Sequence, residues 1–308
     1  MNRAGAPDQI QEDVLSGILC RIGSGLSFST MGAMLKLASM RGLNAPELVF
    51  YRSLFALPVV LFWVLKRENL RVLRPNRAMP HVWRGAMGIV SMGLTFQALI
   101  LLPLAEATAI NFTAPIFATI LSFLILREEV GVHRWSAVLV GFIGVLVVAR
   151  PTGSSLPLLG IAIALTAAIG QASVTTTLRH LQRSEHVTTI VFWFAVSGIV
   201  AGGLAMPFFG QAHDPAAFAL VIAGGLAGGL GQLFMTASLR APVAVIAPFD
   251  YLQIVAATAF GWLLLSDVPN ISTIAGSGLI AASGIYTAWR EHVRRRRLRQ
   301  AAAAVPAV

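Results

Sequence analysis

Charged residues are missing from long stretches of this chain, and those stretches are continuously apolar. Between Trp135 and Leu178 the only charged residue is Arg150, and between Val187 and Ser238 it is Asp214. A bilayer core about 30 Å thick requires roughly 20 apolar residues per spanning helix. A membrane barrel would show short segments of alternating polarity instead. The pattern therefore predicts an all-α polytopic membrane protein.

Turn-forming residues divide the apolar stretches into separate helices. Pro103, the Arg150-Pro151 step and the Asp267-Val268-Pro269-Asn270 segment are the clearest of these breaks. The division predicts ten transmembrane helices, at residues 14–38, 46–65, 82–102, 104–126, 134–149, 157–178, 187–208, 217–238, 242–265 and 269–289.

Composition narrows the class of protein further. The 308 residues are 56% hydrophobic and only 12% charged, whereas soluble domains are about 25% charged. These values exclude a soluble domain, a disordered chain and a nucleic-acid-binding protein. The single cysteine, Cys20, excludes a disulfide framework. The six histidines lack metal-ligand spacing and no phosphate-binding loop is present, so we expect no metal and no cofactor.

The basic residues predict an orientation. Most of the 23 lysines and arginines fall on one side of the ten spans, and the positive-inside rule then places both termini in the cytoplasm, with the protein in the inner membrane. The first span alone favours the opposite orientation. The first 13 residues lack a basic signal-peptide region, so we expect that span to be retained. The basic run at 290–299 is interpreted as an orientation signal facing anionic lipid headgroups.

A weak internal repeat divides the ten spans into two halves. A shift of 143 residues aligns Gly17 with Gly160 and Leu35 with Leu178. Because each half has an odd number of spans, the second copy must be inverted, as in many secondary transporters. The predicted organisation is a cytoplasmic segment at 1–13, five-helix repeats at 14–150 and 151–289, and a basic cytoplasmic tail at 290–308.

Several motifs in this order resemble the EamA-type family of the drug/metabolite transporter superfamily. They include the segments 102–110 (LPLAEATAI), 115–117 (PIF), 127–129 (REE), 247–251 (APFDY) and 261–264 (GWLL). The resemblance covers about residues 14–289. It implies two inverted five-helix repeats around a central cavity, and transport of small organic solutes, often the export of amino acids.

Asp250 is the outstanding ionisable residue, because charges within a bilayer are costly and mark functional sites. It follows Pro248, which is expected to kink the helix and free a backbone carbonyl, and it is close to Tyr251 and Gln253. One interpretation is substrate binding or a protonation switch. The other is a structural pair with a basic side chain near the cytoplasmic end.

Neutral polar residues within the spans are further candidates for substrate contact. Their other role would be hydrogen bonding between helices. Pro115, just after Asn111, is expected to kink the fourth span. The candidates are Ser27 in the first span, Gln97 in the third, Asn111 in the fourth, Gln171 in the sixth and Trp193 in the seventh, the last for stacking or lipid contact.

Four charged residues near outer helix ends are interpreted as gating or structural groups. Arg52 follows Glu47 by five residues, which favours an ion pair between them. Lys36 and Glu106 either join a network of ion pairs with these two residues or extend their charged groups toward the membrane–water interface.

The sequence favours a secondary transporter that exports small metabolites by alternating access, above all amino acids, including apolar and aromatic ones. A vitamin or nucleoside-like substrate, of the riboflavin or S-adenosylmethionine type, is the alternative. An intramembrane enzyme would need clustered catalytic groups, and a structural protein would not need an inverted repeat. We expect a small-molecule substrate and a monomer.

Overall fold

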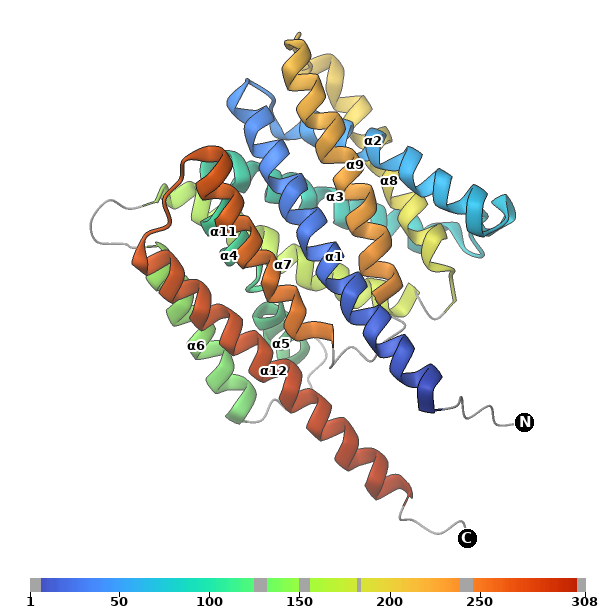
Figure 1. The fold of residues 1–308 in the computed structure, drawn as a ribbon, viewed down its shortest axis with the longest axis vertical. Helices are drawn as coiled ribbons and strands as arrows, with labels where there is room; N and C mark the ends of the chain where they lie inside the picture. Colours follow the sequence, from blue (N-terminus) through green and yellow to red (C-terminus); the bar gives the residue numbers. More distant parts are fainter. Residues whose placement is uncertain (1–6, 125–131, 150–155, 182–183, 239–245, 304–308) are drawn as a thin grey trace.

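The computed structural model describes residues 7–124, 132–149, 156–181, 184–238 and 246–303, and every element in them is helical (Figure 1). The first half contains α1 (Pro7–Met40), α2 (Ala45–Arg67), the 3-10 helix η1 (Leu70–Leu73), α3 (Ala78–Leu101), α4 (Leu104–Asn111), α5 (Ala114–Leu124) and α6 (Val132–Ala149). The second half contains α7 (Leu158–Leu181), α8 (Val187–Phe209), α9 (Pro215–Ser238), the 3-10 helix η2 (Ala247–Tyr251), α11 (Leu252–Leu265) and α12 (Ile271–Ala303).

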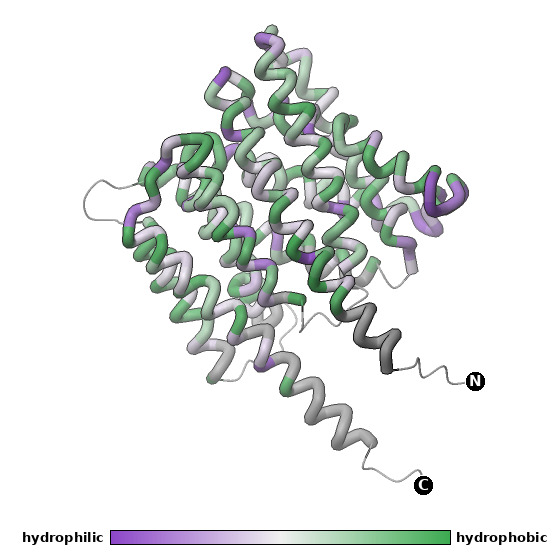
Figure 2. The backbone as a smooth tube through the Cα atoms, viewed as in Figure 1, coloured by the Kyte–Doolittle hydropathy of each residue, from purple (hydrophilic) through white to green (hydrophobic). Residues whose placement is uncertain are grey.

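The helices have the lengths and composition of membrane spans. In the described residues, seven segments are long and apolar enough to cross a bilayer, and three shorter apolar helices lie at 135–149, 158–174 and 271–286. Hydrophobic residues cover the helices along their length, whereas hydrophilic ones gather near loops and helix ends (Figure 2). Large apolar side chains such as Phe62, Trp83 and Leu204 are exposed on the outside, as expected for a surface that faces lipid. The chain is therefore a multi-pass membrane protein.

Helix ends follow local sequence. Asn44 accepts a hydrogen bond from the Glu47 backbone N–H (3.1 Å), and the Glu47 carboxylate accepts one from the Asn44 N–H (3.0 Å), which forms a capping box at the start of α2. Gly42, with φ of 97°, adopts the left-handed conformation that the turn before this cap requires. The loop between α1 and α2 is thereby tightly defined.

Helix packing reveals the internal repeat. α1 packs most extensively against α9, and its counterpart α7 packs against α3, the counterpart of α9. The counterparts α2 and α8 pack against each other, as do α6 and α12, which lie side by side in Figure 1. Each main contact between helices therefore has an equivalent when every helix is replaced by its counterpart in the other half. With five spans in each half, the second half runs through the membrane in the opposite direction.

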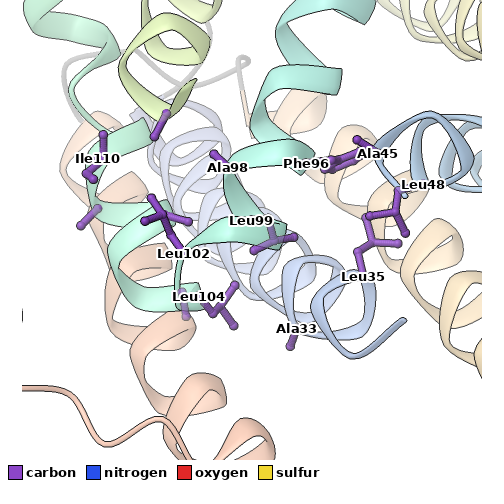
Figure 3. Packing of buried hydrophobic residues seen from close by; sticks show 14 of the residues in the cluster. Ala33, Leu35, Ala45, Leu48, Phe96, Ala98, Leu99, Leu102, Leu104 and Ile110 are labelled. Carbon is purple, nitrogen blue, oxygen red and sulfur yellow. The ribbon is translucent and has the colours of Figure 1, made fainter. Parts of the chain in front are cut away.

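The buried core lies where the two halves meet. Leu35, Leu48, Leu102, Leu104 and Ile110 are almost fully buried in one cluster (Figure 3). Glycines on α9 permit close packing around this core. A Cβ on Gly231 would lie 2.9 Å from the Phe28 ring of α1, and one on Gly229 would lie 3.0 Å from the Ala56 carbonyl oxygen of α2. Small residues at such crossings are typical of membrane helices.

Three elements differ from the predicted spans. The fourth is divided into α4 and α5 at Phe112-Thr113, next to Pro115. In the ninth span, residues 242–245 lie outside the described residues, and the described part begins as η2, which contains Pro248. α12 continues to Ala303 because its arginines and alanines are strong helix formers, so it extends beyond the apolar span. We call the side of the bundle where α1 starts and α12 ends the terminal side, and the other the distal side (Figure 1).

Candidate central cavity and charged contacts

A cavity lies between the two halves and is bordered by α1, α3, α4, α7 and α11. Most of its lining is apolar, and the polar groups in it are neutral hydroxyls and amides. The described residues that line it are Phe28, Ser29, Met31, Gly32, Thr95, Phe96, Ala98, Leu99, Leu104, Ala107, Thr108, Asn111, Ala164, Ala167 and Gln253.

Asn111 is placed at this cavity by the break between α4 and α5. It is the last residue of α4, and Phe112 ends the helix by donating its N–H to the Thr108 carbonyl (3.1 Å). Asn111 Oδ1 is buried and has no hydrogen-bond partner among the described residues. A buried acceptor without a partner is costly. A substrate N–H or a water molecule entering the cavity would satisfy it.

Gln253 reaches the same cavity from the second half. Its backbone carbonyl accepts a hydrogen bond from Ser29 Oγ (3.0 Å), which joins α11 to α1. Ser29, rather than the predicted Ser27, lines the cavity. Residues two apart on a helix are about 200° apart around its axis, so these two serines occupy different faces.

Asp250 forms an ion pair with Arg21 of α1. Arg21 Nη2 donates to Asp250 Oδ2 (2.6 Å), and Nη1 donates to Ser238 Oγ at the end of α9 (3.3 Å). The contact lies toward the terminal side and joins the two halves. Sequence reasoning proposed a basic partner but did not name Arg21, although Arg21 is a charged residue within the first span and itself requires a counter-charge.

Tyr251 follows Asp250 but faces another helix. Its ring packs 5.3 Å from that of Phe112, and its hydroxyl occupies the space beside Gly284 of α12. It is buried and lies outside the described lining of the cavity. Tyr251 therefore joins η2 to α12 and to the break after α4.

The expected pair between Glu47 and Arg52 is not formed. Glu47 is fully buried, and its Oε1 accepts hydrogen bonds from the Gln211 N–H and from His213 Nε2, both at 2.8 Å. Residues five apart on a helix differ by about 140° around its axis, so the two side chains diverge. Glu47 instead attaches α2 to the loop between α8 and α9 on the distal side.

Lys36 and Glu106 bind groups on other helices. Lys36 Nζ donates to the carbonyl oxygens of Leu99, Ile100 and Leu102 at 2.8, 3.0 and 2.9 Å. These belong to the last turn and C-cap of α3, where helices lack carbonyl partners. Glu106 Oε1 accepts from Thr273 Oγ1 of α12 (2.7 Å). Lys36 thus stabilises the first half internally, and Glu106 joins the halves.

The remaining predicted residues do not belong to the described lining of the cavity. Gln97 is partly buried and Gln171 is exposed, and neither is in the described lining. The Trp193 indole N–H donates to the Leu73 carbonyl of η1 (2.9 Å), which places its polar edge against the terminal-side loop. This contact fixes the orientation of the indole.

Sequence analysis missed several buried charged groups. The Glu185 carboxylate accepts from the backbone N–H groups of Asn76 and Arg77 (3.1 and 3.0 Å) and lies 3.6 Å from His81 Nε2. Arg84, near the start of α3, is also buried. Its place in the seventh position of an apolar helix is the signal that could have identified it.

Comparisons with known proteins agree with this architecture. The model of the EamA-like transporter family matches residues 15–150 and 158–289, one match in each half. The pseudopaline exporter CntI of Pseudomonas aeruginosa is 32% identical over 272 residues, covering 88% of this chain and 95% of the relative. The riboflavin transporter of Rhizobium johnstonii is 27% identical over 289 residues, covering 91% and 93%. A solved crystal structure has the same fold, with a TM-score of 0.64, 19% identity and coverage of 92% and 98%. The chain is therefore a member of the EamA-like transporter family, a secondary transporter rather than an enzyme.

Proposed function

We propose that this transporter exports amino acids, including apolar and aromatic ones, across the inner membrane. The central cavity carries the proposal, because its described lining combines apolar side chains with neutral polar groups from both halves. Asn111 Oδ1 offers an acceptor to a substrate amine. The rings of Phe28 and Phe96 offer packing for an apolar or aromatic side chain. Such a lining suits a zwitterion with a large side chain better than a polyanion.

Alternating access in this proposal uses the contacts between the halves. On the terminal side, Arg21 and Asp250 join α1 to η2. On the distal side, Glu47 binds the loop that carries Gln211 and His213. Rocking of the inverted halves around the cavity would loosen one set of contacts while the other holds.

A ring-bearing vitamin is the second candidate substrate. A relative named as a riboflavin transporter matches nearly the whole chain. The cavity also presents aromatic rings next to amides, which suits a flat ring system with hydrogen-bonding edges. The substrate of either kind is a small organic molecule.

Flux measurements on the full chain test both candidates. Purified protein is reconstituted in liposomes loaded with labelled phenylalanine, leucine, glutamate or riboflavin, and efflux is compared with protein-free liposomes. We expect efflux of phenylalanine and leucine above that of glutamate. Efflux of riboflavin with none of the amino acids would replace the proposed substrate by the vitamin, and no efflux of any amino acid would overturn the choice.

We further propose that both termini face the cytoplasm, that the basic end of α12 lies against anionic headgroups, and that the chain acts as a monomer. The distribution of arginines supports the orientation. A fluorescent reporter that folds only in the cytoplasm, fused after Val308, should be active. Activity of a periplasmic reporter at the same place would contradict the orientation.

A further inference from the structure

Two buried glutamates lie at the starts of the counterpart helices α2 and α8, on opposite sides of the bundle. Glu47 is in the first turn of α2 on the distal side, and Glu185 comes directly before the N-cap of α8 on the terminal side. Their side chains are 0% and 2% exposed. Because α2 and α8 pack against each other, the two carboxylates lie at the two ends of one helix pair.

Each glutamate binds the backbone of the loop that leads into the next helix. Glu47 Oε1 accepts a hydrogen bond from the Gln211 N–H (2.8 Å), shortly before α9. The Glu185 carboxylate accepts from the N–H groups of Asn76 and Arg77 (3.1 and 3.0 Å), directly before α3. Since α9 and α3 are also counterparts, replacing each helix by its counterpart converts one arrangement into the other. The two loops differ in sequence, so the equivalence is one of position and contact.

A histidine belongs to each arrangement, but the two Glu–His contacts differ in length. His213 Nε2 lies 2.8 Å from Glu47 Oε1, which is a hydrogen bond. His81 Nε2, in the first turn of α3, lies 3.6 Å from Glu185 Oε2, which is too long for one. This buried nitrogen has no hydrogen-bond partner among the described residues, and such a group is costly. A small shift of α3 toward Glu185 would remove that cost.

The conformation therefore contains one formed Glu–His contact and one unformed equivalent. The terminal side is still joined elsewhere, by the ion pair between Arg21 and Asp250. The two Glu–His contacts are equivalent in position but unmatched in length. This difference is expected if each contact is formed in only one of the two states between which the inverted halves alternate.

We propose that Glu47–His213, the distal contact, and Glu185–His81, the terminal contact, are positioning groups that close the two sides of the bundle in turn. When the distal contact breaks, the terminal contact shortens to a hydrogen bond. Both carboxylates keep their backbone partners, so the histidine is the part that binds and releases. The inference rests on the alternating access of the proposed function, and it is independent of which substrate is carried.

Access to the central cavity from each side tests these contacts. A reporter thiol is introduced by Thr95→Cys in the full chain, with the native thiol removed by Cys20→Ser. Thr95 lines the cavity, and its hydroxyl bonds only within its own helix. A membrane-impermeant maleimide then labels the protein in spheroplasts, which expose one face of the membrane, and in inverted vesicles, which expose the other. The ratio of the two labelling rates reports the resting state.

The variants remove one histidine at a time. His213→Phe and His81→Phe keep a ring but lose the donor, and the double variant loses both donors. His213→Gln and His81→Gln keep an N–H donor and serve as the conservative variants. His186→Phe is the matched control, because His186 is an exposed histidine on the terminal side whose Nδ1 lies 3.9 Å from Glu68. Thermal unfolding in detergent confirms that each variant is folded.

We expect His213→Phe to shift the labelling ratio toward the distal side roughly tenfold, because a buried hydrogen bond to a carboxylate is lost from one state only. His81→Phe should shift the ratio toward the terminal side, and the double variant should return it close to the wild-type value. The glutamine variants should show smaller shifts, and His186→Phe should show none. A purely structural role would lower the unfolding temperatures without moving the ratio in opposite directions.

The outcomes separate this inference from the function on which it rests. Labelling rates that rise together on both sides would reject alternating access, and the inference with it. If gains on one side are matched by losses on the other, alternating access holds. An unchanged ratio in both phenylalanine variants, or shifts of both in the same direction, would then reject the paired contacts alone. A shift in His186→Phe as large as that in His81→Phe would also overturn them.

Discussion

Arg21 of α1 and Asp250 of η2 form an ion pair that joins the first half of the bundle to the second. Their side chains are only 15% and 30% exposed, so each charge depends on the other. Ser238 at the end of α9 also binds Arg21. Three segments therefore meet at one guanidinium on the terminal side.

Breaking this pair should affect stability and transport differently. Arg21→Met or Asp250→Leu alone leaves a partly buried charge without its partner and should cost about 1–3 kcal/mol of unfolding free energy. The double variant removes both charges and should recover most of that stability, yet transport should stay impaired if the pair works in the transport cycle. Thermal unfolding and liposome flux are measured on all three variants. Wild-type flux in the double variant would make the pair purely structural.

Asn111→Ala should weaken substrate handling without a large change in stability. The variant removes the buried acceptor at the central cavity, and a lost hydrogen bond of this kind is worth about 1 kcal/mol. We expect the apparent KM for efflux to rise several-fold. Gln97→Ala is the control, since Gln97 is a neighbouring amide outside the described lining. Equal effects of the two changes would argue against a specific role for Asn111.

Gly284→Ala should destabilise the protein, because a Cβ there collides with the Tyr251 hydroxyl. Forced repacking of this kind typically costs about 1–3 kcal/mol. Gly278→Ala, on the same helix, meets nothing within 4 Å and should be neutral or slightly stabilising. Combining Gly284→Ala with Tyr251→Phe should recover part of the loss. Unfolding midpoints in detergent decide the matter, and similar midpoints for both single glycine variants would refute the expected clash.

Glu47→Gln should lower stability more than Asp214→Asn does. Glu47 is fully buried and binds Asn44, Gln211 and His213, so a neutral amide leaves donors poorly matched at a cost of about 1–3 kcal/mol. Asp214 pairs with Arg41 where both side chains are about half exposed, and such pairs contribute at most about 1 kcal/mol. Chemical unfolding of the two variants gives the comparison. The reverse order would contradict the assignment of Glu47 as the main distal-side anchor.

The number and order of the spans follow from hydrophobic runs and turn residues, which are local properties. Pro115, which is close in sequence, also predicted a break near Phe112-Thr113. Which charged side chains pair with each other does not follow from local sequence. Arg21 and Asp250 are brought together only by the packing of α1 against the second half. Pairing Glu47 with Arg52 from their sequence separation failed, since helix geometry directs them apart and a distant loop supplies His213.

The sequence pointed to helices that line the cavity, but not in every case to the residue on each helix that faces it. Asn111 and Gln253 line it, whereas Ser29 replaces Ser27 and Trp193 is held by η1. Which face of a helix meets the cavity depends on its rotation in the bundle, and an all-round apolar helix gives no periodic signal for that rotation. The burial of Arg84 was missed for a related reason, since a basic residue near a helix end is usually exposed to solvent.

The equivalence of the α1–α9 and α7–α3 contacts has a consequence for the energetics of switching. Suppose that each half takes up the conformation that the other half has now. The backbone packing of the resulting state then closely resembles that of the starting state, seen from the opposite side of the membrane. Large-scale packing then contributes little to the preference between the two states. That preference is set by unmatched side-chain contacts such as Arg21–Asp250 and Glu47–His213. Since about 1.4 kcal/mol shifts a two-state ratio tenfold, one substitution at such a contact can reset the resting state of the transporter.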